Sequence, residues 1–169
     1  MNCVKNKTPK ILFFGILFAA SISKGQIPAS GSDLPSLSSV HWGMDRQEVK
    51  MQIGRDTEEI GDTAIAYQDS LKGSIVHVIL TFGEADSEKG LKFVEVQFDE
   101  KNVDGLRSYL TTRYGNNYET ERKEKTKLFF TVKLEASKWL LRNESIMMMV
   151  FSHGDEVLAL NLLYNRRGK

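Results

Sequence analysis

Cysteine is almost absent from this sequence: the only one in 169 residues is Cys3. A single cysteine near the start of the chain cannot form an internal disulfide. It also leaves the rest of the chain without a thiol nucleophile or a thiolate metal site. Stability must therefore come from a packed hydrophobic core.

Long hydrophobic runs are absent too, apart from one at the start of the chain. Residues 11–20 are apolar with one glycine, Lys5, Lys7 and Lys10 precede them, and small polar residues follow at 21–25. That order is typical of a secretory signal peptide. Ten helical residues span about 15 Å, about half of the hydrocarbon thickness that a membrane anchor must cross. We therefore expect residues 1–25 to be a signal peptide and the protein to be periplasmic or secreted, with no stable membrane anchor.

The expected cleavage site follows Gly25, and a cut after Ser23 is the alternative. Cys3 precedes the apolar run, whereas a lipidated cysteine would follow it. Removing residues 1–25 takes away four of 23 basic residues and none of 22 acidic ones, which leaves a net charge of −3. A nearly balanced charge gives no electrostatic reason to expect nucleic acid or an anionic membrane as a partner.

After the signal peptide, the composition predicts a short leader and one domain. Residues 26–39 contain Pro28, Pro35 and five serines, a composition typical of a flexible leader. We expect order to begin near Val40 and the domain to cover residues 40–169.

Two helices are predicted inside that domain. Asp45 and Glu48 form a capping box for a helix over residues 45–53, and Gly54 suits its left-handed end. A second helix is expected over 103–114, where apolar residues recur on one face and Gly115 follows. Either Asn102 or Asp104 could cap it.

Runs of alternating apolar residues predict strands at 63–68, 74–82, 92–98, 127–134, 139–141, 146–151 and 157–164. Short connections between consecutive strands favour antiparallel pairing. The charge alternation at 119–127 indicates a solvated hairpin or a protected sheet edge. We therefore expect an α+β fold of two helix-plus-antiparallel-sheet units in tandem, at about 40–101 and 102–165, with the helices packed on one sheet face.

Two short motifs resemble those of known exported bacterial domains. The first is the run from His41 through Trp42, Gly43 and Met44 to Asp45, and the second is Tyr114-Gly115 followed by strand, Trp139 and strand. The organisation is similar to the β-lactamase inhibitor protein fold and to a small outer-membrane assembly lipoprotein that shares its half-unit. The resemblance implies an exported, non-enzymatic protein that works through protein contacts on its sheet or loops. Those families carry disulfides or a lipidated cysteine, which this chain lacks, so neither activity transfers.

No residue pattern predicts catalysis, a metal site or a cofactor. The histidines His41, His77 and His153 have no metal-ligand spacing, and no Gly-x-Ser-x-Gly turn marks a serine nucleophile. Methionines 147–149 are expected to pack in a strand, since successive strand side chains point to opposite faces. We expect His77 in a strand opposite the apolar face, His153 in a turn, and no catalytic or metal-binding residues.

The sheet face away from the helices is the candidate binding surface. Alternation places His77, Phe93 and Gln97 there beside Glu95, a mixed aromatic and polar group typical of an interaction site. We therefore predict a protein-binding or scaffold module of the cell envelope, with another envelope or extracellular protein as partner. A small hydrolase or metal-dependent enzyme with an unrecognised site is the main alternative, and a carrier for a small apolar ligand between helix and sheet is a third.

Overall fold

The computed structural model describes residues 33–83, 90–127 and 130–166. The helices are η1 (Pro35–Leu37), α2 (Arg46–Ile53) and α3 (Val103–Tyr114). The strands are β1 (Glu58–Ile60), β2 (Ala64–Leu71), β3 (Ser74–Gly83), β4 (Gly90–Phe98), β5 (Glu119–Lys127), β6 (Phe130–Leu140), β7 (Glu144–His153) and β8 (Glu156–Arg166). The predicted signal peptide, its cleavage site and the first part of the predicted leader lie outside the described residues.

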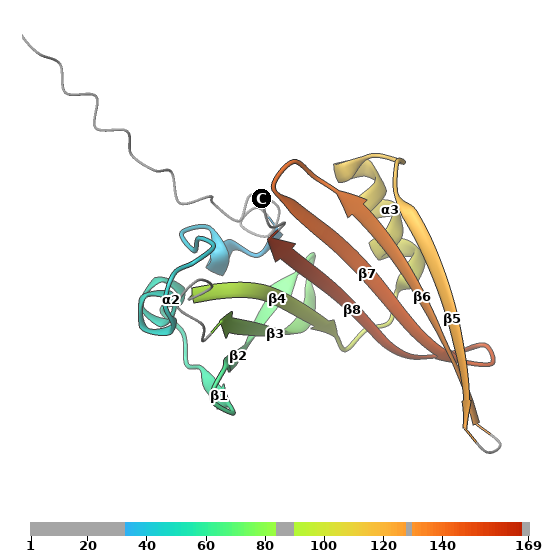
Figure 1. The fold of residues 1–169 in the computed structure, drawn as a ribbon, viewed down its shortest axis with the longest axis horizontal. Coiled ribbons are helices and arrows are strands. Elements are labelled where there is room, and N and C mark those ends of the chain that lie inside the picture. Colours follow the sequence, from blue (N-terminus) through green and yellow to red (C-terminus); the bar gives the residue numbers. More distant parts are fainter. Residues whose placement is uncertain (1–32, 84–89, 128–129, 167–169) are drawn as a thin grey trace, which may run out of the picture.

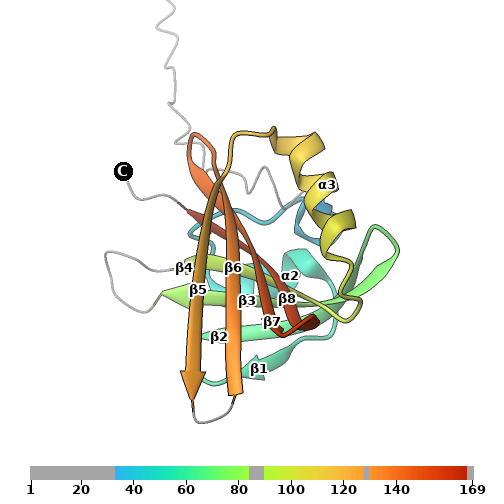
Figure 2. The same ribbon diagram turned by 90° about the vertical axis from the view of Figure 1, so that its right-hand side faces the viewer.

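All eight strands form one antiparallel sheet in the order β1-β2-β3-β4-β8-β7-β6-β5. Each half is a meander of consecutive strands, and the pairing of β4 with β8 joins the halves. Figures 1 and 2 show that β5–β8 cross β1–β4 at a steep angle, so the sheet is strongly twisted. A right-handed twist that accumulates from strand to strand has this effect.

The predicted α+β fold of two tandem helix-plus-sheet units is wrong. Strands dominate the described chain, β4 and β8 merge both sets of strands into one sheet, and the helices do not form a layer over it. The merger has a physical basis in the pairs Val94–Tyr164 and Val96–Leu162, which are fully buried on one face. Alternation within each strand indicates this face but not which outer strands will pair.

One face of the sheet carries the core, and we call it the inner face. On β3 the side chains of Val76, Val78, Leu80 and Phe82 point inward and are buried, as the alternation predicted. Trp139 of β6 is 1% exposed and packs in the same core, a role that suits a large aromatic side chain. The opposite side of the sheet is the outer face.

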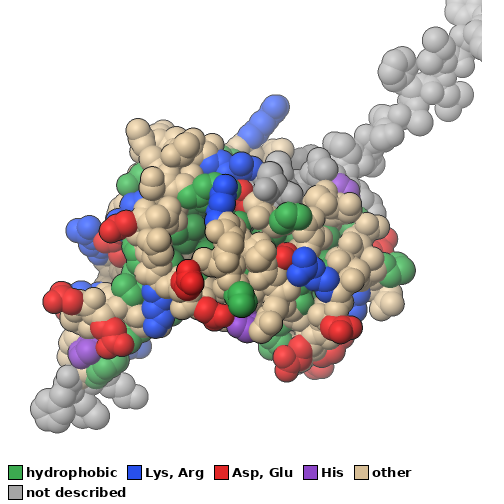
Figure 3. All heavy atoms as spheres, turned by 180° about the vertical axis from the view of Figure 1, so that it is seen from behind, with side chains coloured by type: hydrophobic (Ala, Val, Ile, Leu, Met, Phe, Trp, Pro, Cys, Tyr) green, Lys and Arg blue, Asp and Glu red, His purple; other side chains and the backbone are tan. Residues whose placement is uncertain are grey.

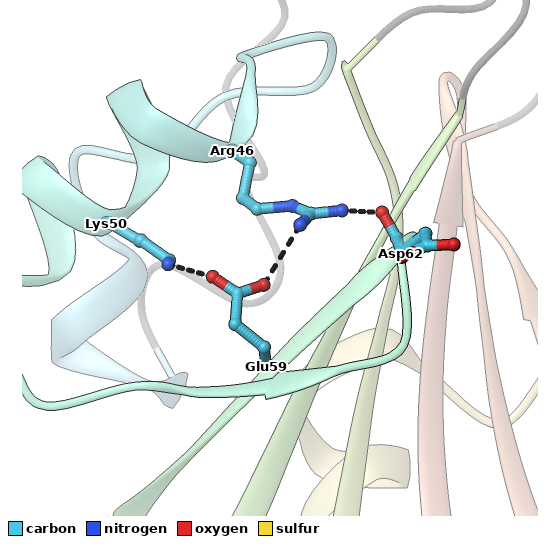
Figure 4. A network of polar contacts seen from close by, with 4 residues as sticks. All are labelled: Arg46, Lys50, Glu59 and Asp62. Atoms are coloured by element: carbon cyan, nitrogen blue, oxygen red, sulfur yellow. Dashed lines mark hydrogen bonds and ion pairs between the residues drawn. The ribbon is translucent and has the colours of Figure 1, made fainter.

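Helix α2 begins and ends where the sequence predicted. The Glu48 backbone N–H donates to Asp45 Oδ1 at 2.8 Å, and the Asp45 N–H donates to Glu48 Oε2 at 3.1 Å, which completes the capping box. Gly54 ends the helix with φ +61°. Arg46 and Lys50 both contact the Glu59 carboxylate of β1, and Arg46 also donates to the Asp62 carbonyl (Figure 4).

We predict that Asp45→Ala lowers the free energy of unfolding by about 1 kcal/mol, because the cap and its reciprocal bond are both lost. Urea denaturation of the variant and the wild type measures this difference. A change below about 0.2 kcal/mol would mean that the cap contributes nothing to the stability of the domain.

Helix α3 also has its predicted bounds. The structure selects Asn102 over Asp104 as the cap, since Asn102 Oδ1 accepts from the Gly105 N–H at 2.9 Å. Leu106 and Leu110 are buried in the core. Each helix thus contributes a few side chains to the core rather than a covering layer.

Residues 33–40 form a segment that we call the strap. Its side chains Leu34, Leu37 and Val40 are each 0% exposed, and η1 within it contacts α2. The last seven residues of the predicted leader, 33–39, are therefore part of the folded domain, with Leu34 and Leu37 in its core. The serine- and proline-rich composition of this stretch predicted a flexible leader, although its two leucines, Leu34 and Leu37, are buried.

Two strands differ from the prediction. β1 was not predicted, because its three residues, Glu58–Ile60, are all exposed. β6 is one strand of 11 residues where two short strands were expected. β5 is an edge strand of the sheet, in agreement with the protected sheet edge that its alternating charges indicated.

No helix in the described ranges is long and apolar enough to cross a membrane.

Candidate functional site

The outer face is free of both α-helices. The α2 side chains contact Glu59, which pairs in register with the buried Ile65, so α2 lies on the inner side. The α3 side chain Arg107 contacts Glu135, which pairs with the buried Val150, so α3 lies on the inner side too. The outer face is thus open over the described part of the chain.

Strand β4 presents a row of three side chains on this outer face: Phe93, Glu95 and Gln97. They alternate with the buried Val94 and Val96. Phe93 is 36% exposed, a large fraction for an aromatic side chain in the middle of a sheet. The row combines an apolar ring, a carboxylate and an amide within one short stretch of backbone.

A hydrogen-bond network holds the Glu95 carboxylate in place. Its Oε1 accepts from Gln97 Nε2 at 3.1 Å and from Asn161 Nδ2 of β8 at 2.8 Å. Within the described residues, no side chain donates a hydrogen bond to Oε2. A carboxylate with one oxygen fixed and one open is oriented to accept a hydrogen bond from a second molecule.

The structure brings two of the three predicted site residues together. His77 pairs directly with Gln97 across β3 and β4, and its Nε2 lies 3.5 Å from Asp99 Oδ1. Phe93 lies on the same face, further along β4, opposite Thr81. The sequence did not predict Asn161 as part of this site, because its place beside Gln97 depends on the pairing of β4 with β8.

The histidines lie in three separate places. His153 was predicted in a turn, but it ends β7, where its ring stacks on Phe130 with 4.2 Å between centroids. His41 lies beside α2, on the strap side of the molecule. The described residues contain no group of three His, Cys, Asp or Glu side chains that could hold a metal ion.

The methionines at 147–149 alternate as predicted. Met148 is fully buried on the inner face, and its neighbours on both sides are half-buried on the outer face. These side chains therefore pack within the sheet, which confirms the packing role, and Met148 points to the opposite face from its two neighbours.

A second polar group surrounds the buried Asp33 of the strap, at the edge of the core. Its carboxylate accepts from the hydroxyls of Tyr109, Tyr114 and Tyr164, the last two at 2.8 and 3.2 Å. Arg113 Nε lies 3.1 Å from Asp33 Oδ1. The group joins the strap to α3 and β8, so its role is to hold three segments together.

Burial and the charge of Asp33 change the acidity of these tyrosines. Burial, followed by the bond to Asp33, raises the pKa of Tyr109 to about 12. The same causes hold the pKa of Tyr114 and of Tyr164 above the usual value. A further buried tyrosine, Tyr67 of β2, has its pKa raised by burial as well.

We predict that the contribution of these tyrosines to stability is constant up to about pH 10 and then falls as pH rises towards 12. Because the pKa of these tyrosines is higher in the folded than in the unfolded state, their contribution is present below the unfolded value and lost above it. Tyrosinate absorbance should appear together with loss of circular dichroism. Four tyrosines ionising near pH 10 in a protein that is still folded would contradict this prediction.

Asp69 is another buried acid, and it is bound by Ser36 of the strap. The hydroxyl of Ser36 donates to its Oδ2, Arg55 Nη2 lies 3.0 Å from its Oδ1, and Ser36 also lies 2.9 Å from the Tyr67 hydroxyl. Ser36 has no histidine partner to take its proton, so this group has the chemistry of a structural tie and not of a nucleophile.

The chemistry available on the outer face is therefore recognition: an open carboxylate oxygen, an amide, an imidazole and an exposed ring. Figure 3 shows the molecule from behind the view of Figure 1, the side on which α3 lies, and both acidic and basic side chains are visible there. No family model matches this chain, and neither does any curated protein or solved structure.

Proposed function

We propose that this protein is an exported protein-binding module of the cell envelope, and that its partner docks on the outer face around Phe93, Glu95 and Gln97. The observation that carries the proposal is Glu95, whose Oε1 accepts from two amides while Oε2 accepts from no side chain of the described residues, two positions along β4 from the exposed Phe93. A rigid polar group next to an apolar side chain is the usual composition of an interface centre.

The chemistry of this surface specifies the partner. Glu95 and Asp99 are acidic, and neither β2 nor β3 contains a Lys or Arg. We therefore expect the partner to bring a lysine or arginine to Glu95 and an apolar side chain to Phe93. Such charge complementarity governs specificity and association rate more than affinity.

The outer face is large enough for a specific complex. Nine residues of a strand extend about 30 Å, and the six strands from β2 to β6 in spatial order cover about 24 Å, which gives roughly 700 Å². A specific interface of standard size buries about 600–1,000 Å² on each partner, and this area falls within that range.

The test is an affinity measurement on a partner identified by capture from envelope extract. We expect Phe93→Ala to weaken binding about tenfold or more, and Glu95→Gln to weaken it and reduce its dependence on salt. Met51→Ala is the matched control, because Met51 is 67% exposed on α2, away from the outer face.

A second variant keeps this test decisive. The triple variant His77→Ala, Phe93→Ala and Gln97→Ala removes the predicted contact surface while leaving the core intact. If the partner binds this folded variant as tightly as the wild type, or if Met51→Ala weakens binding instead, the outer face is not the interface.

Export through the predicted signal peptide is tested separately, by the N-terminus of the mature protein. Protein recovered from the envelope fraction should begin at Gln26, or at Lys24 if cleavage follows Ser23, as N-terminal sequencing and mass spectrometry determine. Full-length protein found only in the cytoplasm would contradict export.

A further inference from the structure

A polar cleft lies on the inner side of the molecule, between α3 and strands β5 and β6. Its volume is about 430 Å³, and it is lined by Arg107, Tyr118, Thr120, Arg122, Glu135 and Ser137. A second cavity of about 460 Å³ shares Arg122 and Glu135 with it, so the two adjoin. The cleft lies on the opposite side of the sheet from Phe93 and Glu95.

Two arginines share one carboxylate in this cleft. Arg107 Nη2 lies 2.6 Å from Glu135 Oε1, and Arg122 Nε lies 2.8 Å from Glu135 Oε2. The three groups leave one positive charge in excess. Each guanidinium carries five N–H donors in a fixed planar arrangement, so donors remain for a second carboxylate.

The wall of the cleft is aromatic and fixed. The Tyr118 ring lies 4.7 Å from the Trp139 ring with an angle of 35° between them, and Trp139 Nε1 donates to the Gly115 carbonyl at 2.9 Å. Trp139 is 1% exposed, which anchors the pair. A flat apolar group can therefore stack on Tyr118 within the same cavity that the arginines face.

We propose that this cleft binds a carboxylate joined to a flat apolar group, with the carboxylate on Arg107 and Arg122 and the apolar group on Tyr118. Glu135 holds both guanidiniums in place and competes with the ligand for them. The carboxylate comes either from a small organic acid or from the C-terminus of a peptide that ends in an aromatic residue. This inference is independent of the proposed interface on the outer face.

Titration of the purified protein with phenylacetate, followed by NMR of the Arg122 Nε–H and Trp139 Nε1–H signals, tests the proposal. We expect saturable shifts in both signals and none with 2-phenylethanol, which lacks the carboxylate. Acetyl-Ala-Ala-Phe and its C-terminal amide identify the source, because the free peptide acid binds more tightly than phenylacetate only if the natural ligand is a peptide end.

Two variants in the cleft should change the affinity for phenylacetate in opposite directions. Arg107→Gln should weaken phenylacetate binding about tenfold, and Glu135→Gln should strengthen it several-fold by removing the competing carboxylate. Arg46→Gln is the matched control, because it breaks another arginine–glutamate pair and should leave affinity within about twofold. The NMR spectrum itself reports whether each variant is folded.

Two results would overturn the proposal. One is the absence of saturable binding by both wild type and Glu135→Gln up to about 10 mM phenylacetate, well beyond the range of a specific site. The other is binding that Arg107→Gln leaves unchanged, since the arginines would then serve only to join α3 to the sheet.

Discussion

Replacing Asp33 by alanine should lower the free energy of unfolding by about 3 kcal/mol, because hydrogen bonds to a charged group contribute about 1.5–3 kcal/mol each and several are lost together. Its carboxylate accepts from three tyrosine hydroxyls and lies 3.1 Å from Arg113 Nε, and its side chain is 0% exposed. Without it, the Tyr164 hydroxyl loses its charged acceptor inside the core, and Tyr109 and Arg113 lose theirs at the edge of the core. A domain of this size has only about 5–15 kcal/mol in total, so the variant should be marginal.

Urea denaturation monitored by circular dichroism measures this effect. Asp33→Asn keeps the shape and removes the charge, and it should also cost stability because the amide nitrogen faces hydroxyl and guanidinium donors. Asp56→Ala, an exposed acid on the α2–β1 connection, is the control and should change stability by less than about 0.5 kcal/mol. A loss below about 1 kcal/mol in Asp33→Ala would show that the strap is held by its leucines alone.

Gly90→Ala should cost about 3 kcal/mol or more, for two reasons. Gly90 has φ +92°, a conformation that costs a residue with a Cβ about 1–2 kcal/mol. A Cβ at this position would also overlap the Gly43 carbonyl and lie 2.7 Å from the Gly43 Cα. The Gly43 N–H donates to the Leu91 carbonyl at 3.1 Å, so neither backbone can move away without losing this contact.

Gly73→Ala separates the two causes. Gly73 has nearly the same backbone angle, φ +86°, but an added Cβ has no heavy atom within 4 Å. It should therefore cost only the conformational part, about 1–2 kcal/mol. If Gly73→Ala and Gly90→Ala lower the free energy of unfolding equally, the close approach of Gly43 to Gly90 does not contribute to the cost of Gly90→Ala.

Local signals in the sequence predicted both α-helices to within a residue. For α2, the Asp45 and Glu48 side chains and Gly54 act on neighbouring backbone groups, so the relevant physics lies within ten residues. The inward alternation on β3 and β4 was predicted for the same reason, because one buried face determines it.

Long-range pairing was not predictable in this way. Nothing in the sequence of β4 or β8 alone indicates that Val96 will pair with Leu162. Without that pairing, the two sets of strands are predicted as separate units. β1 carries no buried residue, so it has no hydrophobic pattern to detect. Strand order depends on packing between segments that are far apart in the chain.

The candidate site was predictable in part. The face that carries His77, Phe93 and Gln97 follows from alternation, whereas the bond from Asn161 to Glu95 joins residues 66 positions apart. The Asp33 cluster has no sequence signal at all, because its tyrosines come from α3 and β8 and its acid from a stretch rich in serine and proline. Buried polar groups of this kind depend on the completed fold.

The most direct test of the proposed interface is site-specific photocrosslinking in living cells, with a photoreactive residue in place of Gln97 or, as control, of Met51. We expect one discrete protein adduct from position 97 on the outer face and none from position 51 on α2. An adduct from position 51 with none from position 97, or the same adducts from both, would contradict the outer face as the binding surface.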